Sequence, residues 1–91
     1  MPVTKEQIEK CAELVKQYGA SKLVLFGSAL ENLETAHDLD LACDGVDGWN
    51  FFELGALLEE IVSAPVDLIP LRPPTRFSKY IEKQGKIIYQ I

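Results

Sequence analysis

Short apolar runs alternate with amphipathic stretches along all 91 residues of the chain. The apolar runs are bounded by Gly, Pro or charged residues, which is typical of short strands. The stretches between them repeat apolar residues at helical spacing, which indicates helices with one buried face. Strands that alternate with helices can share one core, so we expect an α/β (α+β) fold, a mixed sheet of about four strands flanked by helices. A chain of this length has room for one domain, residues 1–91.

Capping and breaking signals set the expected ends of these elements. Thr4 and Gln7 have the spacing of a capping box at a helix start, and Gly19 can end that helix. Thr75 follows two prolines and can cap the last helix, which Gly85 can end. We expect helices over about residues 5–18, 28–35, 49–62 and 75–83, and strands over about residues 22–26, 38–43, 65–70 and 86–91.

The charge is distributed unevenly. Residues 23–71 contain ten carboxylates and no Lys or Arg, whereas residues 72–91 carry five basic residues and one Glu. The formal net charge of −5 argues against a protein that binds nucleic acid through clustered basic residues. No apolar run approaches the about 20 residues that span a bilayer, and the N-terminal segment has no secretory signal, so we expect a cytoplasmic protein without a membrane partner.

Two cysteines and three aromatic residues are expected to lie in the core or at its edge. Cys11 and Cys43 lie among apolar neighbours without a base nearby in the sequence, as buried free thiols do. Trp49, Phe51 and Phe52 are expected in the core or at its edge, and an exposed pair among them would indicate a partner surface.

Three aspartates lie on the expected strands. Asp38 and Asp40 are two residues apart, so both side chains leave the same face of their strand. Asp67 interrupts another apolar strand, where an acidic residue is disfavoured unless it is exposed or has a partner. Because residues 23–71 offer no basic partner, the three carboxylates indicate an oxygen-ligated divalent metal, Mg²⁺ or Mn²⁺. The simpler interpretation is a solvated strand face.

A Gly-Ser turn precedes these aspartates in the sequence. Gly27 and Ser28 end one expected strand and open a short helix, which leaves backbone N–H groups and a hydroxyl where a phosphate can rest. Taken alone, such a turn is most simply an ordinary strand end. A metal beside a phosphate is, however, the arrangement used in phosphoryl and nucleotidyl transfer.

These residues together resemble a known family, the minimal nucleotidyltransferases of the DNA polymerase beta superfamily. The resemblance rests on the segments Leu25-Phe26-Gly27-Ser28, Asp38-Leu39-Asp40-Leu41 and Val66-Asp67-Leu68, and it extends along nearly the whole chain. Many relatives of this size are antitoxins encoded beside a HEPN-domain toxin, and some transfer AMP from ATP to a tyrosine of the toxin.

The resemblance implies a role for each of five residues. Gly27 and Ser28 would hold the triphosphate of ATP, and Asp38 and Asp40 would ligate the metal ions, Mg²⁺ or Mn²⁺. Asp67 would ligate the second metal and help to activate the acceptor hydroxyl. It also implies a HEPN-type toxin as the partner, in a hetero-oligomer or with further copies of the chain.

The chain also departs from the family pattern. Relatives usually carry Arg directly after the Gly-Ser turn, where this chain has Ala29, and His37 stands where relatives often have Ser. Glu31 and Glu34 follow instead, and both repel a triphosphate. The alternative function is therefore a catalytically degraded domain that neutralises a partner by binding, and a third is a regulatory domain that binds metal alone.

The basic residues near the C-terminus allow two interpretations. They either keep that face soluble or bind nucleotide phosphates or an acidic partner. His37 is most simply a loop residue. A domain this short has little room for a base-recognition pocket, which a partner or a second subunit could supply. The basic residues concerned are Arg72, Arg76, Lys79, Lys83 and Lys86.

Overall fold

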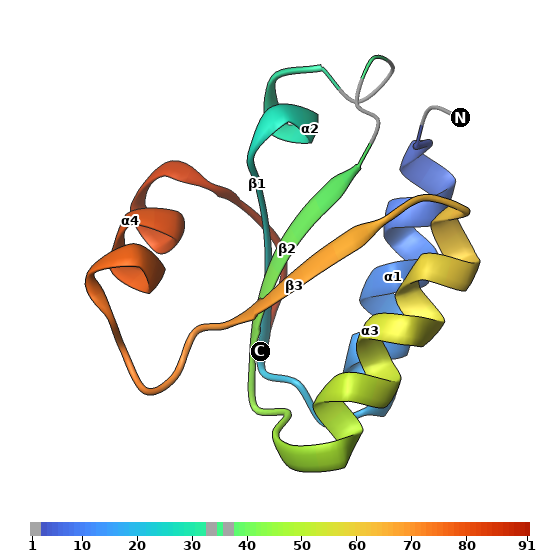
Figure 1. The fold of residues 1–91 in the computed structure, drawn as a ribbon. Coiled ribbons are helices and arrows are strands. Elements are labelled where there is room, and N and C mark those ends of the chain that lie inside the picture. The colour runs from blue at the N-terminus through green and yellow to red at the C-terminus, as the bar shows by residue number, and fades with distance from the viewer. Residues whose placement is uncertain (1–2, 33–34, 36–37) are drawn as a thin grey trace.

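The computed structural model describes residues 3–32, 35 and 38–91. Its strands form one sheet in the order β3-β2-β1-β4, in which β2 and β3 are parallel and the other neighbours antiparallel (Figure 1). The expected mixed sheet with flanking helices is thereby confirmed. The strands are β1 (Lys22–Phe26), β2 (Leu39–Asp44), β3 (Val66–Pro70) and β4 (Lys86–Gln90). The helices are α1 (Lys5–Gln17), α2 (Ser28–Glu31), α3 (Gly48–Val62) and α4 (Arg76–Gln84).

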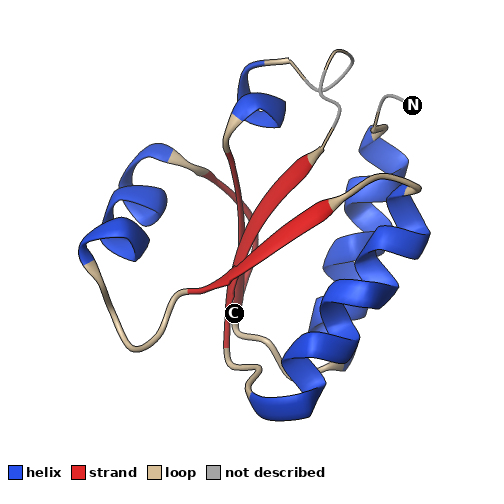
Figure 2. Cartoon of the chain, viewed as in Figure 1, coloured by secondary structure: helices blue, strands red, loops and turns tan. Residues whose placement is uncertain are grey.

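The helices divide between the two faces of the sheet, with α1 and α3 on one face and α4 on the other (Figure 2). The side chains of β2 alternate accordingly. Leu39, Leu41 and Cys43 are buried in the main core with residues of α1 and α3, whereas Ala42 packs with Ile81 of α4. Period-2 alternation thus gives the sheet two different faces, and the α4 face is the less completely covered.

The predicted caps form at both ends of the chain. The Thr4 hydroxyl accepts a hydrogen bond from the Gln7 N–H at 3.1 Å, and the Gln7 side chain accepts one from the Thr4 N–H at 2.9 Å. Thr75 caps α4 through the same reciprocal arrangement with Ser78. Most element boundaries therefore lie within a residue or two of those expected.

Two boundaries differ from the prediction. Helix α2 ends at Glu31 instead of near residue 35, because Asn32 has an extended backbone with φ of −151°. Strand β2 begins at Leu39, which leaves Asp38 immediately before the strand. His37 lies outside the described residues.

The prediction that the aromatic cluster of α3 lies in the core is wrong for two of its three members. Trp49 and Phe52 are 86% and 73% exposed, and their ring centroids are 6.1 Å apart. The buried stripe of α3 runs through Leu54 and Leu58, and helical spacing places Trp49 and Phe52 together on the opposite side. Phe51 alone packs against the main core.

Both cysteines are buried in the main core, as expected. Burial raises the pKa of the Cys11 thiol to about 11. Burial, with a smaller effect from the Asp44 carboxylate, raises the pKa of Cys43 to about 11 as well. Both thiols are therefore protonated at neutral pH and act as apolar core residues.

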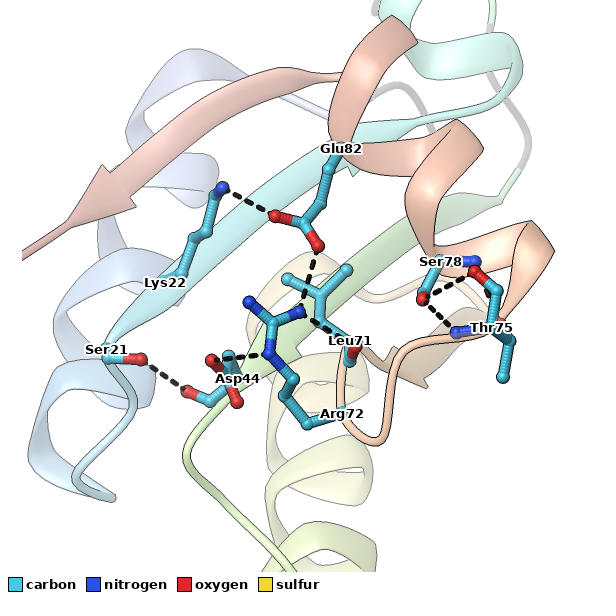
Figure 3. Close-up of polar contacts among 8 residues, drawn as sticks. All are labelled: Ser21, Lys22, Asp44, Leu71, Arg72, Thr75, Ser78 and Glu82. Atoms are coloured by element: carbon cyan, nitrogen blue, oxygen red, sulfur yellow. Dashed lines mark hydrogen bonds and ion pairs between the residues drawn. The ribbon is translucent and has the colours of Figure 1, made fainter.

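A polar network holds α4 against the sheet (Figure 3). The Glu82 carboxylate accepts hydrogen bonds from Lys22 Nζ of β1 at 2.9 Å and from Arg72 Nη1 at 3.0 Å. Arg72 Nε also lies 3.9 Å from the Asp44 carboxylate of β2. The hydrogen bonds from Lys22 and Arg72 lower the pKa of Glu82, so its carboxylate stays ionised near neutral pH. The network sets the position of α4 relative to β1 and β2.

No helix in the described part of the chain combines the length and the apolarity that crossing a bilayer requires.

Candidate active site

The fold brings the strand aspartates to one edge of the sheet. Asp40 of β2 lies directly opposite Asp67 of β3 in the parallel register, and neighbouring strands are about 4.8 Å apart. Asp38 precedes Asp40 by two residues. Asp40 and Asp67 alternate with Leu41 and Leu68, which pack in the main core, so both carboxylates belong to the α4 face.

The three carboxylates act on one another electrostatically. Asp40 is partly buried, whereas Asp38 and Asp67 are exposed. Burial raises the pKa of Asp40 above its usual value, and the negative charges of Asp38 and Asp67 raise it further. Within the described ranges no Lys or Arg forms an ion pair with any of the three. The described Lys and Arg side chains therefore leave the negative charge at this corner of the sheet unneutralised.

The Gly-Ser turn lies directly beside Asp40. Gly27 follows Phe26, which pairs with Asp40 across β1 and β2. Gly27 has φ of 78° and ψ of −155°, a conformation that essentially only glycine adopts. A Cβ atom at Gly27 would overlap the Asp40 carboxylate. Ser28 opens α2 with an exposed side chain, so the turn and the carboxylates form one continuous site.

Glu59 has a structural role that the sequence does not indicate. Its side chain is exposed on α3, and its carboxylate accepts a hydrogen bond from the Val66 N–H at 2.9 Å. This contact fixes the first residue of β3, next to Asp67. Its partner is seven residues away in the next element, and no local pattern signals such a contact.

The donor set suits a metal ion that arrives together with a phosphate. In the part of the chain that the structure describes, no three Asp, Glu, His or Cys side chains gather closely enough to hold an ion alone. Mg²⁺ is usually bound by one or two carboxylates together with substrate phosphates and water. Asp40 and Asp67, with Asp38 nearby, match that mode better than a metal site formed by the protein alone.

A cavity of about 390 Å³ adjoins the Gly-Ser turn. It lies between α2 and α4 and is lined by Phe26, Gly27, Ser28, Leu30, Glu31, Tyr80, Ile81 and Gln84. Tyr80 and Gln84 carry no sequence signal for a binding site, and only the tertiary packing of α4 brings them near the turn.

The basic residues near the C-terminus, from Arg72 to Lys86, do not line this cavity. Arg72 is engaged by Glu82 and Asp44. Arg76, Lys79 and Lys83 are exposed on α4. Among the described residues, none that lines the cavity would therefore offer a cation to a triphosphate at the turn.

The chain belongs to the polymerase beta nucleotidyltransferase family, whose model matches residues 9–91. At the level of the family it is thus a nucleotidyltransferase, and the nucleotidyltransferase fold inferred from the motif segments is confirmed. No curated protein matches the sequence significantly.

Solved structures with the same fold come from toxin–antitoxin systems. One is a toxin–antitoxin with AMP-PNP, with a TM-score of 0.77 and 23% identity over 92% of this chain and 73% of the other. Another is the complex of a tri-AMPylated HEPN toxin with its MNT antitoxin from Shewanella oneidensis, with a TM-score of 0.75 and 22% identity over 96% of this chain and 72% of the other. A third is an MntA-HepT toxin–antitoxin, with a TM-score of 0.75 and 21% identity over 97% of this chain and 74% of the other.

Proposed function

We propose that the chain is a metal-dependent nucleotidyltransferase that transfers AMP from ATP to a protein hydroxyl, as the antitoxin partner of a HEPN-type toxin. The observation that carries this proposal is the placement of Asp40 opposite Asp67 and beside the Gly27 turn. The solved structures with AMP-PNP and with an AMPylated toxin support the choice of nucleotide and of partner.

Each residue of the site then has a distinct task. Gly27 and Ser28 bind the triphosphate, for which the turn offers backbone N–H groups and an exposed hydroxyl. Asp38 and Asp40 would hold the metal ions, Mg²⁺ or Mn²⁺, and Asp67 would ligate the second ion. When bound, such ions neutralise charge on the phosphates and on the attacking and leaving oxygens.

The transfer itself is an in-line displacement at the α-phosphorus. The acceptor oxygen forms a new bond to the α-phosphorus. The bond between the α-phosphorus and the oxygen that bridges to the β-phosphate breaks, and pyrophosphate leaves. Asp67 is exposed, so an acceptor hydroxyl can approach it and give up its proton there. Asp40 is less exposed and keeps its carboxylate beside the turn.

Co-expression with a HEPN toxin encoded beside the chain tests the proposal. Intact-mass spectrometry is expected to show the toxin heavier by one or more adenylyl groups. The variant Asp38→Asn/Asp40→Asn is expected to leave the toxin unmodified while still folding. A tight complex in which the toxin keeps its unmodified mass would contradict the transfer reaction.

One observation favours the second candidate function, a domain that neutralises its partner by contact alone. Trp49 and Phe52 form an exposed aromatic pair on α3, on the face of the sheet opposite α4. Exposed aromatic side chains that lie together are typical of protein interaction surfaces. Binding through this pair does not require the carboxylates at all.

Replacing the aromatic pair separates contact from catalysis. Trp49→Ser/Phe52→Ser is expected to weaken toxin binding by about 30-fold or more, because the loss of even one aromatic hot spot at an interface costs about 2 kcal/mol or more. Ile91→Ser removes an equally exposed apolar side chain elsewhere and serves as the control. Unchanged affinity by biolayer interferometry would exclude this surface.

A further inference from the structure

The cavity between α2 and α4 is lined mostly by apolar and uncharged polar residues, whereas the neighbouring edge of the sheet is acidic. Resting on the nucleotide-binding function above, we propose that it receives the nucleobase of the bound nucleotide, with the ring of Tyr80 stacked on the base and the Gln84 amide bonded to its edge. The short domain therefore contains its own base site, although its length alone gave little reason to expect one.

The charges in the cavity argue against phosphate as its occupant. Among the described residues that line it there is no Lys, Arg or His, and the one charged side chain is the Glu31 carboxylate. A phosphate placed between Glu31 and the aspartates would be repelled from both sides. The phosphates therefore belong on the turn side, where metal ions can neutralise them.

The same lining suits a flat, mostly apolar heterocycle. Phe26 and Leu30 supply apolar walls, and Tyr80 is 61% exposed, so its ring is accessible for stacking on a base. Gln84 offers both a donor and an acceptor, the pair with which an amide reads the edge of adenine. Base stacking on an aromatic side chain with hydrogen bonds to the base edge is the usual way proteins bind unpaired bases.

The position of the cavity matches the course of a nucleotide. Gly27 and Ser28 line it on one side, and Gly27 abuts Asp40 on the other. A nucleotide whose base occupies the cavity can therefore place its phosphates at the turn, next to the Asp40 carboxylate. The network around Glu82 anchors α4 to the sheet, which keeps the backbone of Tyr80 and Gln84 near the turn.

Comparison of two ligands separates base contacts from phosphate contacts. In calorimetry with Mg²⁺, Tyr80→Ala is expected to weaken ATP binding by about 5-fold to 150-fold, the range that loss of one stacking contact gives. The same variant is expected to bind inorganic tripolyphosphate as the natural chain does. Tyr80→Phe is expected to recover most of the ATP affinity, and Ile91→Ala controls for loss of an exposed apolar side chain.

Two outcomes of this comparison overturn the base site while leaving the nucleotidyltransferase proposal intact. One is an ATP affinity that Tyr80→Ala leaves unchanged. The other is an equal loss of ATP and tripolyphosphate affinity, which would place phosphate in the cavity. Thermal unfolding of the variant shows whether α4 has kept its packing.

Adenosine tests the base site independently of metal and phosphate. In the Asp38→Asn/Asp40→Asn variant, millimolar adenosine is expected to shift the NMR signals of the Gln84 side-chain amide and the Tyr80 ring, and Tyr80→Ala is expected to abolish the Gln84 shift. Such shifts would support the base site even if the natural chain showed no metal-dependent ATP binding. Absence of any shift would overturn it.

Discussion

The Asp40→Asn variant is expected to fold more stably than the natural chain and to lose nucleotidyl transfer by at least about 100-fold. Burial and the charges of Asp38 and Asp67 raise the pKa of Asp40 in the folded state, so ionisation at neutral pH costs folding free energy. Removing that carboxylate should increase the free energy of unfolding by up to about 1 kcal/mol, the scale of a like-charge pair across strands.

The pH dependence of this gain has a definite sign. Because the folded pKa of Asp40 lies above the unfolded one, the penalty is present at neutral pH and fades as the pH falls through the folded pKa. The stability difference between Asp40→Asn and the natural chain should therefore shrink in acid. Urea unfolding at neutral and acidic pH measures it.

A matched carboxylate controls for general charge effects. Glu60 is an exposed acid within residues 23–71, the segment that contains no Lys or Arg. Glu60→Gln is expected to change neither the free energy of unfolding nor nucleotidyl transfer measurably. If Asp40→Asn behaved like Glu60→Gln in both assays, the aspartates would be an ordinary solvated strand face.

The Gly27→Ala variant is expected to lose about 2 to 4 kcal/mol of unfolding free energy and all detectable ATP binding. Alanine is strained at the positive φ of this position, and its Cβ would displace the Asp40 carboxylate. The substitution therefore disturbs both the folded backbone and the position of the Asp40 carboxylate in the candidate site.

A second glycine provides the control for this experiment. Gly55 lies within α3, and a Cβ there would meet no atom within 4 Å. Gly55→Ala is expected to stabilise the chain by about 0.5 to 1 kcal/mol, because alanine is the better helix former. Chemical denaturation of both variants should give changes of opposite sign, and a stable, ATP-binding Gly27→Ala protein would contradict the assigned geometry.

Much of the fold follows from local patterns in the sequence. Capping residues such as Thr4 and Thr75 define helix starts, and the alternation in β2 places Leu39 and Leu41 on the core face. An apolar residue type alone does not predict burial in a helix, because the position of the residue relative to the buried stripe decides which side it faces. Trp49 and Phe52 are apolar, but their spacing from the buried stripe of α3 turns them outward.

The candidate site is only partly accessible to sequence reasoning. Spacing predicts Asp38 and Asp40 on one face of a strand, but the strand begins at Leu39, so only Asp40 lies within it. The pairing of Asp40 with Asp67 depends on the parallel register of β2 and β3, which no local signal determines. Tyr80 and Gln84 reach the turn only through the docking of α4, so the cavity could not be predicted from the sequence.

Calorimetric titration of the chain with ATP in the presence and absence of Mg²⁺ tests whether nucleotide binding at these carboxylates depends on metal. We expect saturable binding to the natural chain that requires Mg²⁺ and that Asp38→Asn/Asp40→Asn abolishes. The absence of heat with the natural chain, or identical binding by the double variant, would contradict a metal-dependent nucleotide site at this edge of the sheet.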